Sequence, residues 1–434
     1  MLSRVLSFSI TGVLLGVNAT AHEISPMPEA YCDGNGTVAN FQCELARAMR
    51  AEDDASIRRI VREAHAALGD ELAVPEAPDN YSAVPETEPP SNEKLAGVWG
   101  MYLDRIQQDP FWRNHPKPQS LPGPLRGLSD FVVGMLAARR AGLDPDDRGL
   151  AMAHEMGDYL LWAQEQGGAG VFGVPDLRGK TGRVPELVTR FLAKADAARV
   201  TDRVLKNGWL IDDWGGGDLQ FDNGLAGAAL LQLYGATGES RYLDSARSAG
   251  EWAISQPCVP NWNYNSFSVY LLAELYRVTG EARYLESAER KTRIGVLPGL
   301  ILEGPKAGRW GDPHNARLVY HYILCRGMAA LLSAMPGDDP EREILRDALV
   351  LALKTRNTEI IEKGVANPDT VLEVLSRVMR DFGSDETFVT ETRCDEALAV
   401  LQEYVASQLR KNQLPVGAGA MGLYSELMMN RGEN

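Results

Sequence analysis

The sequence LLQLYGATGESRYLDSA at residues 230–246 recurs as LAELYRVTGEARYLESA at residues 272–288. Tyr234 in the first copy matches Tyr276 in the second, and the whole match keeps a constant offset of 42 residues. Each copy contains a helical pattern, a tight Thr-Gly-Glu turn and a second helical pattern. A repeat of this length that contains only helical patterns predicts stacked αα-hairpins.

The two ends of each hairpin differ in composition. The segment before the first helix is long and rich in polar and aromatic residues: GWLIDDWGGGDLQFDN at 208–223 and VPNWNYNS at 259–266. The segment between the two helices is only a short turn. Long loops on one rim of a repeat scaffold are where a functional site is expected, so we look for the site on that rim.

The overall composition indicates a soluble globular protein. The chain has 434 residues, of which 44% are hydrophobic, and nothing in it is typical of disorder. Its formal net charge of −15 disfavours a nucleic-acid partner, because phosphate binding requires a basic surface. We therefore expect no nucleic acid among its partners.

Residues 1–21 are typical of a signal peptide. Arg4 is followed by an apolar run, and the small residues Ala19 and Ala21 fit cleavage before His22. A membrane anchor is the alternative, but the apolar run is shorter than the ~20 residues needed to span a bilayer and is interrupted by hydroxyl residues. We expect a periplasmic or secreted protein with no membrane attachment after cleavage.

The five cysteines fit an oxidising compartment only in part. Cys32 and Cys43 lie close together near the mature N-terminus, which favours a disulfide between them. Cys258, Cys325 and Cys394 lie among apolar neighbours, as buried free thiols do. No CxxC or HExxH pattern occurs, so no metal site of familiar spacing is indicated and we expect no cofactor.

The chain divides into four parts. Residues 1–21 form the signal peptide, and residues 22–71 carry two helical patterns that predict a small N-terminal hairpin. Residues 72–92 contain five prolines among glutamates, which favours a linker or a strap on the surface. Residues 93–434 are expected to form the main domain.

The main domain is predicted to be helical throughout. Outside the repeat, the periodicity and the punctuation by Gly, Pro and Asp predict helices at 94–107, 130–141, 148–165, 185–204, 316–335, 341–363, 369–382, 391–411 and 419–429. No stretch has the length and alternation of a convincing strand. The fold class is therefore all-α, and the paired helices favour a closed ring of hairpins over an open solenoid.

The LYxxTGExRYLxSA hairpins, with Asp222-Asn223 or Tyr264-Asn265 entering the preceding helix, support a further comparison. They resemble the (α/α) toroids of the six-hairpin glycosidase-like superfamily, which includes glycoside hydrolases, polysaccharide lyases and sugar epimerases. The resemblance covers residues 93–410 and lies in scaffold motifs, so it implies the toroid fold rather than one activity. It also implies that substrate binds in a cleft on the rim where the inner helices begin.

Four aspartates on that rim could perform hydrolysis. Cleavage of a glycosidic bond needs one protonated carboxyl group and one ionised carboxylate several ångströms away. We expect Asp212, Asp213 and Asp222 to act in catalysis and Asp218 to bind substrate. The alternative is structural, because Asp-Asp beside Gly-Gly-Gly is a common turn composition and Asp222 could simply cap its helix.

Elimination on a uronic-acid polymer requires other residue types. An amide or Arg neutralises the carboxylate, and Tyr or His serves as base and acid. We expect Tyr264 and His314 in these catalytic roles. His314 and His321 would share a helix face if the helix starts early enough. Tyr320 and His321 could equally be core residues with satisfied polar tips.

The remaining polar and aromatic residues of the rim loops are predicted to bind substrate. These residues are Arg178, Trp214, Asn223, Trp262, Asn263, Asn265, Arg309, Trp310, Asn315 and His321. Three of them are tryptophans, one in each rim loop, which favours stacking on sugar rings. Hydrophobic plugs between hairpins are the alternative for these tryptophans.

The sequence thus predicts an exported carbohydrate-active enzyme acting on an oligosaccharide or polysaccharide. Hydrolysis by rim aspartates is the first hypothesis, β-elimination the second, and a non-catalytic glycan-binding or scaffold protein the third. Successive loops in the same phase of the repeat should emerge on one side of the ring. The loops 212–223, 262–265 and 309–315 are therefore expected to meet in one cleft, with Gly238 and Gly280 on the opposite face.

Overall fold

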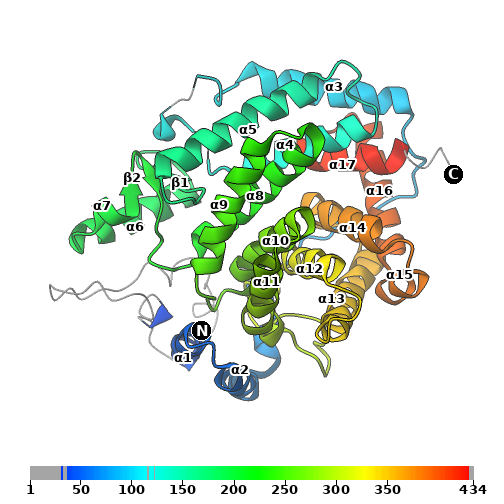
Figure 1. Ribbon diagram of the computed structural model, residues 1–434. Coiled ribbons are helices and arrows are strands. Elements are labelled where there is room, and N and C mark those ends of the chain that lie inside the picture. The colour runs from blue at the N-terminus through cyan, green and yellow to red at the C-terminus, as the bar shows by residue number, and fades with distance from the viewer. Residues whose placement is uncertain (1–30, 33–36, 115–116, 122, 430–434) are drawn as a thin grey trace.

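A computed structural model describes residues 31–32, 37–114, 117–121 and 123–429 of the chain (Figure 1). The expected signal peptide, residues 1–21, lies outside the described residues. No helix in the described part of the chain has both the length and the apolar character needed to cross a membrane.

Six inner helices form a closed ring. Each packs against the next, and the last packs against the first. In order around the ring they are α4 (Arg126–Arg140), α8 (Asp218–Thr237), α10 (Trp262–Thr279), α12 (Leu318–Ala334), α14 (Pro368–Phe382) and α17 (Ala418–Met429). The expected all-α toroid, including closure of the ring, is confirmed.

An outer helix covers each inner helix. The pairs are α4 with α5 (Arg148–Gly167), α8 with α9 (Ser240–Ser255), α10 with α11 (Ala282–Gly295), α12 with α13 (Arg342–Lys363), α14 with α16 (Cys394–Arg410) and α17 with α3 (Asn92–Gln108). A short helix, α15 (Glu386–Thr392), precedes α16, so the helix expected from residue 391 begins at Cys394 instead. The last inner helix pairs with the first outer one, and the two ends of the domain therefore lie together (Figure 1).

The inner helices are buried on nearly every side, and small residues let them approach closely. On α8, a Cβ at Gly224 would collide with the backbone of Phe267 on α10. At their C-terminal ends, α8 and α10 stop at Gly238 and Gly280, whose φ angles of 75° and 68° favour glycine. These turns lie at the end of the inner helices opposite to the long loops.

Between α5 and α8 the chain leaves the ring. A three-stranded antiparallel sheet of order β1-β3-β2 forms from β1 (Val174–Pro175), β2 (Leu205–Lys206) and β3 (Trp209–Leu210). Beside it lie α6 (Arg183–Ala197) and α7 (Thr201–Val204), which share a separate small apolar cluster with the sheet. The single helix expected over 185–204 is wrong, because the backbone turns at Arg199 with a φ of 58°.

The N-terminal hairpin lies against the outer face of the ring. It consists of α1 (Thr37–Arg50) and α2 (Asp54–Leu68), and α2 contacts α11. Met49 and Ile57 are buried in the same continuous core as the ring helices. Cys32 and Cys43 form a disulfide, whereas the other cysteines are free and buried.

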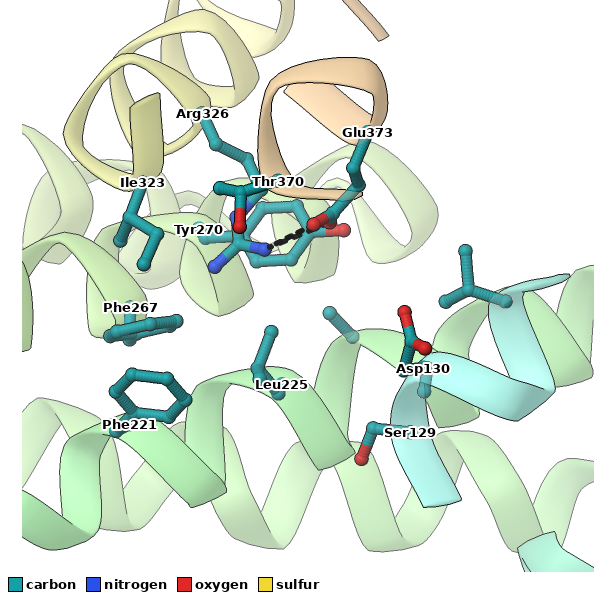
Figure 2. A pocket seen from close by; sticks show the side chains of 13 residues that line it. Ser129, Asp130, Phe221, Leu225, Phe267, Tyr270, Ile323, Arg326, Thr370 and Glu373 are labelled. Carbon is teal, nitrogen blue, oxygen red and sulfur yellow. Dashed lines mark hydrogen bonds and ion pairs between the residues drawn. The ribbon is translucent and has the colours of Figure 1, made fainter. Parts of the chain in front are cut away.

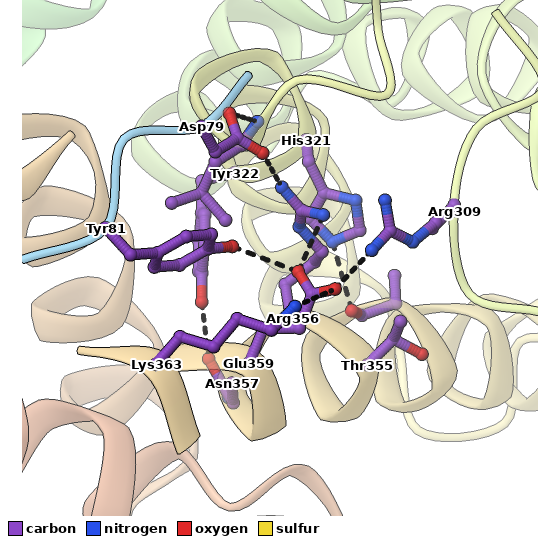
Figure 3. Close-up of polar contacts among 12 residues, drawn as sticks. Asp79, Tyr81, Arg309, His321, Tyr322, Thr355, Arg356, Asn357, Glu359 and Lys363 are labelled. Atoms are coloured by element: carbon purple, nitrogen blue, oxygen red, sulfur yellow. Dashed lines mark hydrogen bonds and ion pairs between the residues drawn. The ribbon is translucent and has the colours of Figure 1, made fainter. Parts of the chain in front are cut away.

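The proline-rich segment 72–92 crosses the ring as a strap. Ser82 pairs with Val365 in an isolated antiparallel bridge. Asp79 forms an ion pair with the fully buried Arg356 of α13, and the hydroxyl of Tyr81 donates to Glu359 (Figure 3). The strap is therefore fixed to the ring through buried polar contacts.

Candidate active site

The three rim loops meet at the N-terminal ends of the inner helices. The hydroxyl of Tyr264 on α10 donates a hydrogen bond to the carboxylate of Asp218 on α8. The backbone N–H and the Nδ2 of Asn263 both donate to Oδ1 of Asn315, at 3.1 and 2.9 Å. Loops that are distant in sequence are thus joined side chain to side chain on one face of the ring.

Arg126 enters this cluster from the first turn of α4. Its Nε lies 3.1 Å from Oδ1 of Asp222, and its Nη2 lies 3.0 Å from Oδ2. The guanidinium also lies 3.6 Å above the ring of Phe221. Asp222 is completely buried by this pairing, and it does not cap α8, which begins at Asp218. We expected Asp222 to act directly in catalysis. Because it is completely buried, this expectation is corrected: Asp222 holds Arg126 in place.

Asp218 is the carboxyl group of the cluster best suited to carry a proton. It is partly exposed at the first position of α8. Burial of its carboxyl and the neighbouring Asp213 raise its pKa to about 7, although the hydrogen bond from Tyr264 and the charge of Arg126 oppose this. A carboxyl group with such a pKa is protonated in half of the molecules near neutral pH.

The adjacent aspartates differ in environment. Asp213 accepts from the N–H of Leu219 at 2.9 Å and so caps α8, while burial raises its pKa to about 6. Asp212 instead pairs with Arg203 at 2.7 Å and accepts from the N–H of Trp214 at 2.8 Å. Asp212 is thus engaged at the α6–α7 side of the loop, and its expected catalytic role stays a prediction.

Tyr31, from the N-terminal segment, is also part of the rim. It is buried against Tyr264 and Val259, and its hydroxyl donates to the carbonyl of Gly216 at 2.8 Å. Burial and the charge of Asp218 raise the pKa of its phenol well above the usual value. No local sequence pattern indicated Tyr31, because Gly216, which accepts its hydrogen bond, lies 185 residues farther along the chain.

His314 is held by the strap rather than by a helix. Its Nδ1 lies 3.0 Å from Oε1 of Glu76, and its ring stacks on Tyr320 with the ring centres 4.0 Å apart. Burial opposes ionisation of Glu76, but the hydrogen bond with His314 and the charge of Arg317 outweigh it and lower the pKa of Glu76. Since α12 begins at Leu318, the helix face expected to carry both His314 and His321 does not exist.

Several predicted substrate-binding residues are instead core residues. His321 is fully buried, with Nε2 3.0 Å from the carbonyl of Ala352 and its ring edge-on to Trp310. Burial lowers its pKa well below the usual value. The Nε1 of Trp310 donates to Val296 at 3.0 Å, and Trp262 is buried against Gly299. The plug interpretation is therefore correct for Trp262 and Trp310, and their expected stacking role is wrong.

The rim asparagines fasten loops to helices. The Nδ2 of Asn223 donates to Ala249 at 3.0 Å, and that of Asn265 donates to Gly295 at 2.7 Å. Arg309 pairs with Glu359 in the network that also holds the strap (Figure 3). The expected role in substrate binding is corrected for Asn223 and Asn265, since both are fully buried, whereas that of the partly exposed Arg309 stays a prediction. Asn263 and Asn315 bond to each other, and both donate from Nδ2 to Oδ1 of Asn261.

Arg178 and Trp214, like Asp218, are predicted binding residues that keep exposed surface. Arg178 pairs with Asp176, and 42% of its side chain remains exposed. Trp214 is half-buried and packs edge-on to Phe191 of α6, with ring centres 5.9 Å apart. Beside them lies a mostly apolar pocket between α6 and α8, whose polar wall consists of Arg126, Asp212, Asp213 and Asp218.

Below the rim cluster, a cavity of about 110 Å³ lies along the axis of the ring, and Figure 2 shows the side chains that line it. Its polar lining residues include Asp130, Arg326 and Glu373, from α4, α12 and α14. Phe221 and Tyr270 contribute aromatic surface. Sequence reasoning missed this cavity because these residues lie inside helices, one to two turns from the start. The signal that could have found them is charged residues at inward-facing positions of otherwise apolar inner helices.

Within the described residues, no group of three or more His, Cys, Asp and Glu side chains is arranged to hold a metal ion.

Comparison with known proteins gives two distant structural similarities. No family model matches the chain, and a search of curated proteins finds no match either. A solved polysaccharide lyase aligns with 80% of this chain and 99% of its own, with 11% identity and a TM-score of 0.47. A glycosyl hydrolase of family 88 from Bacteroides vulgatus aligns with 77% of this chain and 99% of its own, with 13% identity and a TM-score of 0.43. Similarity of this degree carries no argument about activity, which has to be inferred from the residues of the site.

Proposed function

We propose that this protein is a carbohydrate-active enzyme that hydrolyses a glycosidic bond at the loop rim of the ring, with Asp218 as the proton donor. The observation that carries the proposal is the environment of Asp218. It is a partly exposed carboxyl group at the mouth of the ring with a pKa raised to about 7. A general acid is most effective when its pKa lies near the working pH.

Hydrolysis also needs an ionised carboxylate close to the acid. Asp213 has the lower pKa of the two neighbours, about 6, because backbone N–H groups of the loop stabilise its charge against burial. The charge of Asp213 helps to raise the pKa of Asp218, so between about pH 6 and pH 7 Asp213 is mostly ionised while Asp218 is mostly protonated. One protonated and one ionised carboxyl group is the arrangement that glycosidic cleavage uses.

β-Elimination is less well supported by the same cluster. Tyr264 would have to act as a base, yet burial and the charge of Asp218 raise the pKa of its phenol well above the usual value. Arg126 would have to neutralise a uronate, yet its charge is already paired with Asp222. Both roles would require breaking contacts that are present in the structure.

One experiment separates these reactions. The purified protein is incubated with a panel of neutral and acidic oligosaccharides and polysaccharides, and both new reducing ends and ultraviolet absorbance are followed. Hydrolysis produces reducing ends without the absorbance of an unsaturated uronate. If the absorbance rises together with the reducing ends, the reaction is elimination and not hydrolysis. If glycans raise the melting temperature but are not cleaved, the protein is a glycan-binding protein and not an enzyme.

We further propose that the protein is exported. The disulfide between Cys32 and Cys43 supports this, because disulfides persist in oxidising compartments and are rare in the cytosol. Expression of the full chain in a Gram-negative host, followed by fractionation and N-terminal sequencing, should yield a periplasmic protein that begins at His22. A cytosolic protein that retains Met1 would contradict the proposal.

A further inference from the structure

The axial cavity contains a cation whose hydrogen-bonding capacity is only partly used. Arg326 projects into it from α12, with only 4% of its side chain exposed. Its Nη1 bonds both carboxylate oxygens of Glu373, at 2.8 and 3.1 Å (Figure 2). The Nε and Nη2 atoms of Arg326 are buried and lack a hydrogen-bond partner among the described residues. Buried polar groups without a partner are rare in proteins and often mark the place of a ligand or water.

The charges around the cavity are unbalanced. Arg326 is neutralised by Glu373, and Asp130 of α4 and Asp369 of α14 add two further carboxyl groups nearby. Burial, Glu373 and Asp369 raise the pKa of Asp130 to about 7. Among the lining residues, the one cation is Arg326, which is already paired, so a carboxylate on a ligand would enter a region of negative potential.

The other walls of the cavity are flat and apolar. The ring of Phe267 lies under the guanidinium of Arg326 at 5.0 Å, and the ring of Tyr270 lies at 4.7 Å. Phe221 packs against Phe267 with ring centres 3.9 Å apart and the ring planes tilted by 39°. Aromatic faces combined with unused donors and carboxylate acceptors suit a ring that has both C–H faces and hydroxyl groups.

We propose that the axial cavity is a subsite for an uncharged sugar residue, whose hydroxyl groups accept from Nε and Nη2 of Arg326 and donate to Asp130. This proposal rests on the proposed function, and it specifies that the substrate carries a residue without a carboxylate at this position. Phe221 lines the cavity and also supports Arg126 at the rim. The subsite is therefore continuous with the cluster around Asp218, and its far wall lies about 10 Å along α8, which is roughly two turns of helix.

The test measures binding, separately from cleavage. Isothermal titration of the Asp218→Asn protein with neutral trisaccharides of glucose, galactose, mannose and xylose, and with trigalacturonate, gives the preference of the site. We expect at least one neutral trisaccharide to bind more tightly than trigalacturonate. If trigalacturonate binds more tightly, or no neutral trisaccharide binds, the inference is overturned.

Two variants locate that binding in the cavity. Thr370→Phe fills the cavity from the first turn of α14, where Thr370 is only half-buried and the helix has room to tolerate it. It should weaken binding of the neutral trisaccharide about tenfold or more, as should Arg326→Lys, which removes the Nε and Nη2 donors while keeping the charge. Thr189→Phe, on the exposed face of α6, is the matched control and should leave affinity unchanged.

The outcomes distinguish this inference from the proposed function. Unchanged affinity in the folded Thr370→Phe protein overturns the subsite, even if the wild-type protein hydrolyses glycans. Neutral trisaccharide binding that Thr370→Phe abolishes supports the subsite, even if no glycan is cleaved and the hydrolase proposal fails. A melting temperature within a few degrees of wild type shows that each variant is folded.

Discussion

Arg126 and Asp222 form a bidentate ion pair that joins the first turn of α4 to the second turn of α8, with N–O distances of 3.1 and 3.0 Å. Asp222 is completely buried, whereas 37% of the Arg126 side chain remains exposed. The pair thus presents an oriented guanidinium face at the mouth of the ring. Because Asp222 is buried and accepts two hydrogen bonds from Arg126, it holds that guanidinium in a fixed orientation, as a polar site built on helices requires.

Asp218→Asn should remove the proposed proton donor while keeping the shape of the side chain. The hydroxyl of Tyr264 can still donate to the amide oxygen, so the loop geometry should persist. We expect kcat/KM on a cleaved glycan to fall about 10²- to 10⁴-fold, the usual contribution of general acid catalysis. The matched control is Asp212→Asn, in the same loop but paired with Arg203, and it should retain activity within about threefold. Equal losses in the two variants would show that Asp218 is not the acid.

The pH dependence of the rate should report the same group. Because Asp218 must be protonated to act, and its pKa is about 7, kcat/KM should decline as the pH rises above that value. On the acid side, activity should fall as Asp213, with a pKa of about 6, becomes protonated. A rate profile of the wild-type protein between pH 4 and 10 tests both limbs. A rate that stays flat up to pH 9 would exclude Asp218 as the proton donor.

The raised pKa of Asp218 also affects stability. The folded protein holds this proton up to about pH 7, whereas the unfolded chain loses it near pH 3.8. Between these values the folded state binds more protons, so stability falls as the pH rises. At pH 8 the buried charge is a cost, and Asp218→Asn should increase the free energy of unfolding by about 2–4 kcal/mol. At pH 3.5 the variant and the wild type should be equally stable by urea denaturation, and a destabilised variant at pH 8 would contradict the shift.

The repeat predicted the fold and the convergence of the rim loops because both follow from the phase of the hairpins. Tyr264 and Asp218 occupy the starts of neighbouring inner helices, and this alone brings them together. The repeat could not predict which residues face inward at those starts. Trp262 is buried while Trp214 is not, because the first is covered by the N-terminal hairpin and the strap-side loops.

The partners missed by sequence reasoning are those supplied from outside the repeat. Arg126, Tyr31 and Glu76 each reach the rim from a segment with a different local pattern. Their contacts depend on how the ring closes and on the path of the strap. No periodicity encodes these features.

The strap should depend on its buried ion pair. Asp79 pairs with Arg356, which is only 1% exposed and also bonds Glu359 at 2.7 Å (Figure 3). Asp79→Ala leaves part of that buried charge unpaired, so we expect a loss of about 3 kcal/mol in the free energy of unfolding. The control on the same strap is Glu88→Ala, whose pair with Arg410 is largely exposed and should be worth less than about 1 kcal/mol. Urea denaturation measures both, and similar small losses would mean that the strap is not fixed through Asp79.

Closure of the ring should depend on glycines where α17 crosses α4. A Cβ added to Gly134 would lie 2.5 Å from the Cα of Gly419, and one added to Gly422 would collide with the backbone of Gly134. Backbone cannot move aside as a flexible side chain can, so Gly422→Ala must push the two helices apart. We expect it to lower the free energy of unfolding by about 2–3 kcal/mol, the range of overpacked cores. Gly97→Ala on the exposed face of α3 is the control, because nothing lies within 4 Å of its added Cβ. That variant should be more stable than wild type by up to about 1 kcal/mol, since alanine favours helix. If Gly422→Ala proves as harmless as Gly97→Ala in thermal unfolding, then α4 and α17 do not pack this closely and the ring is open between them.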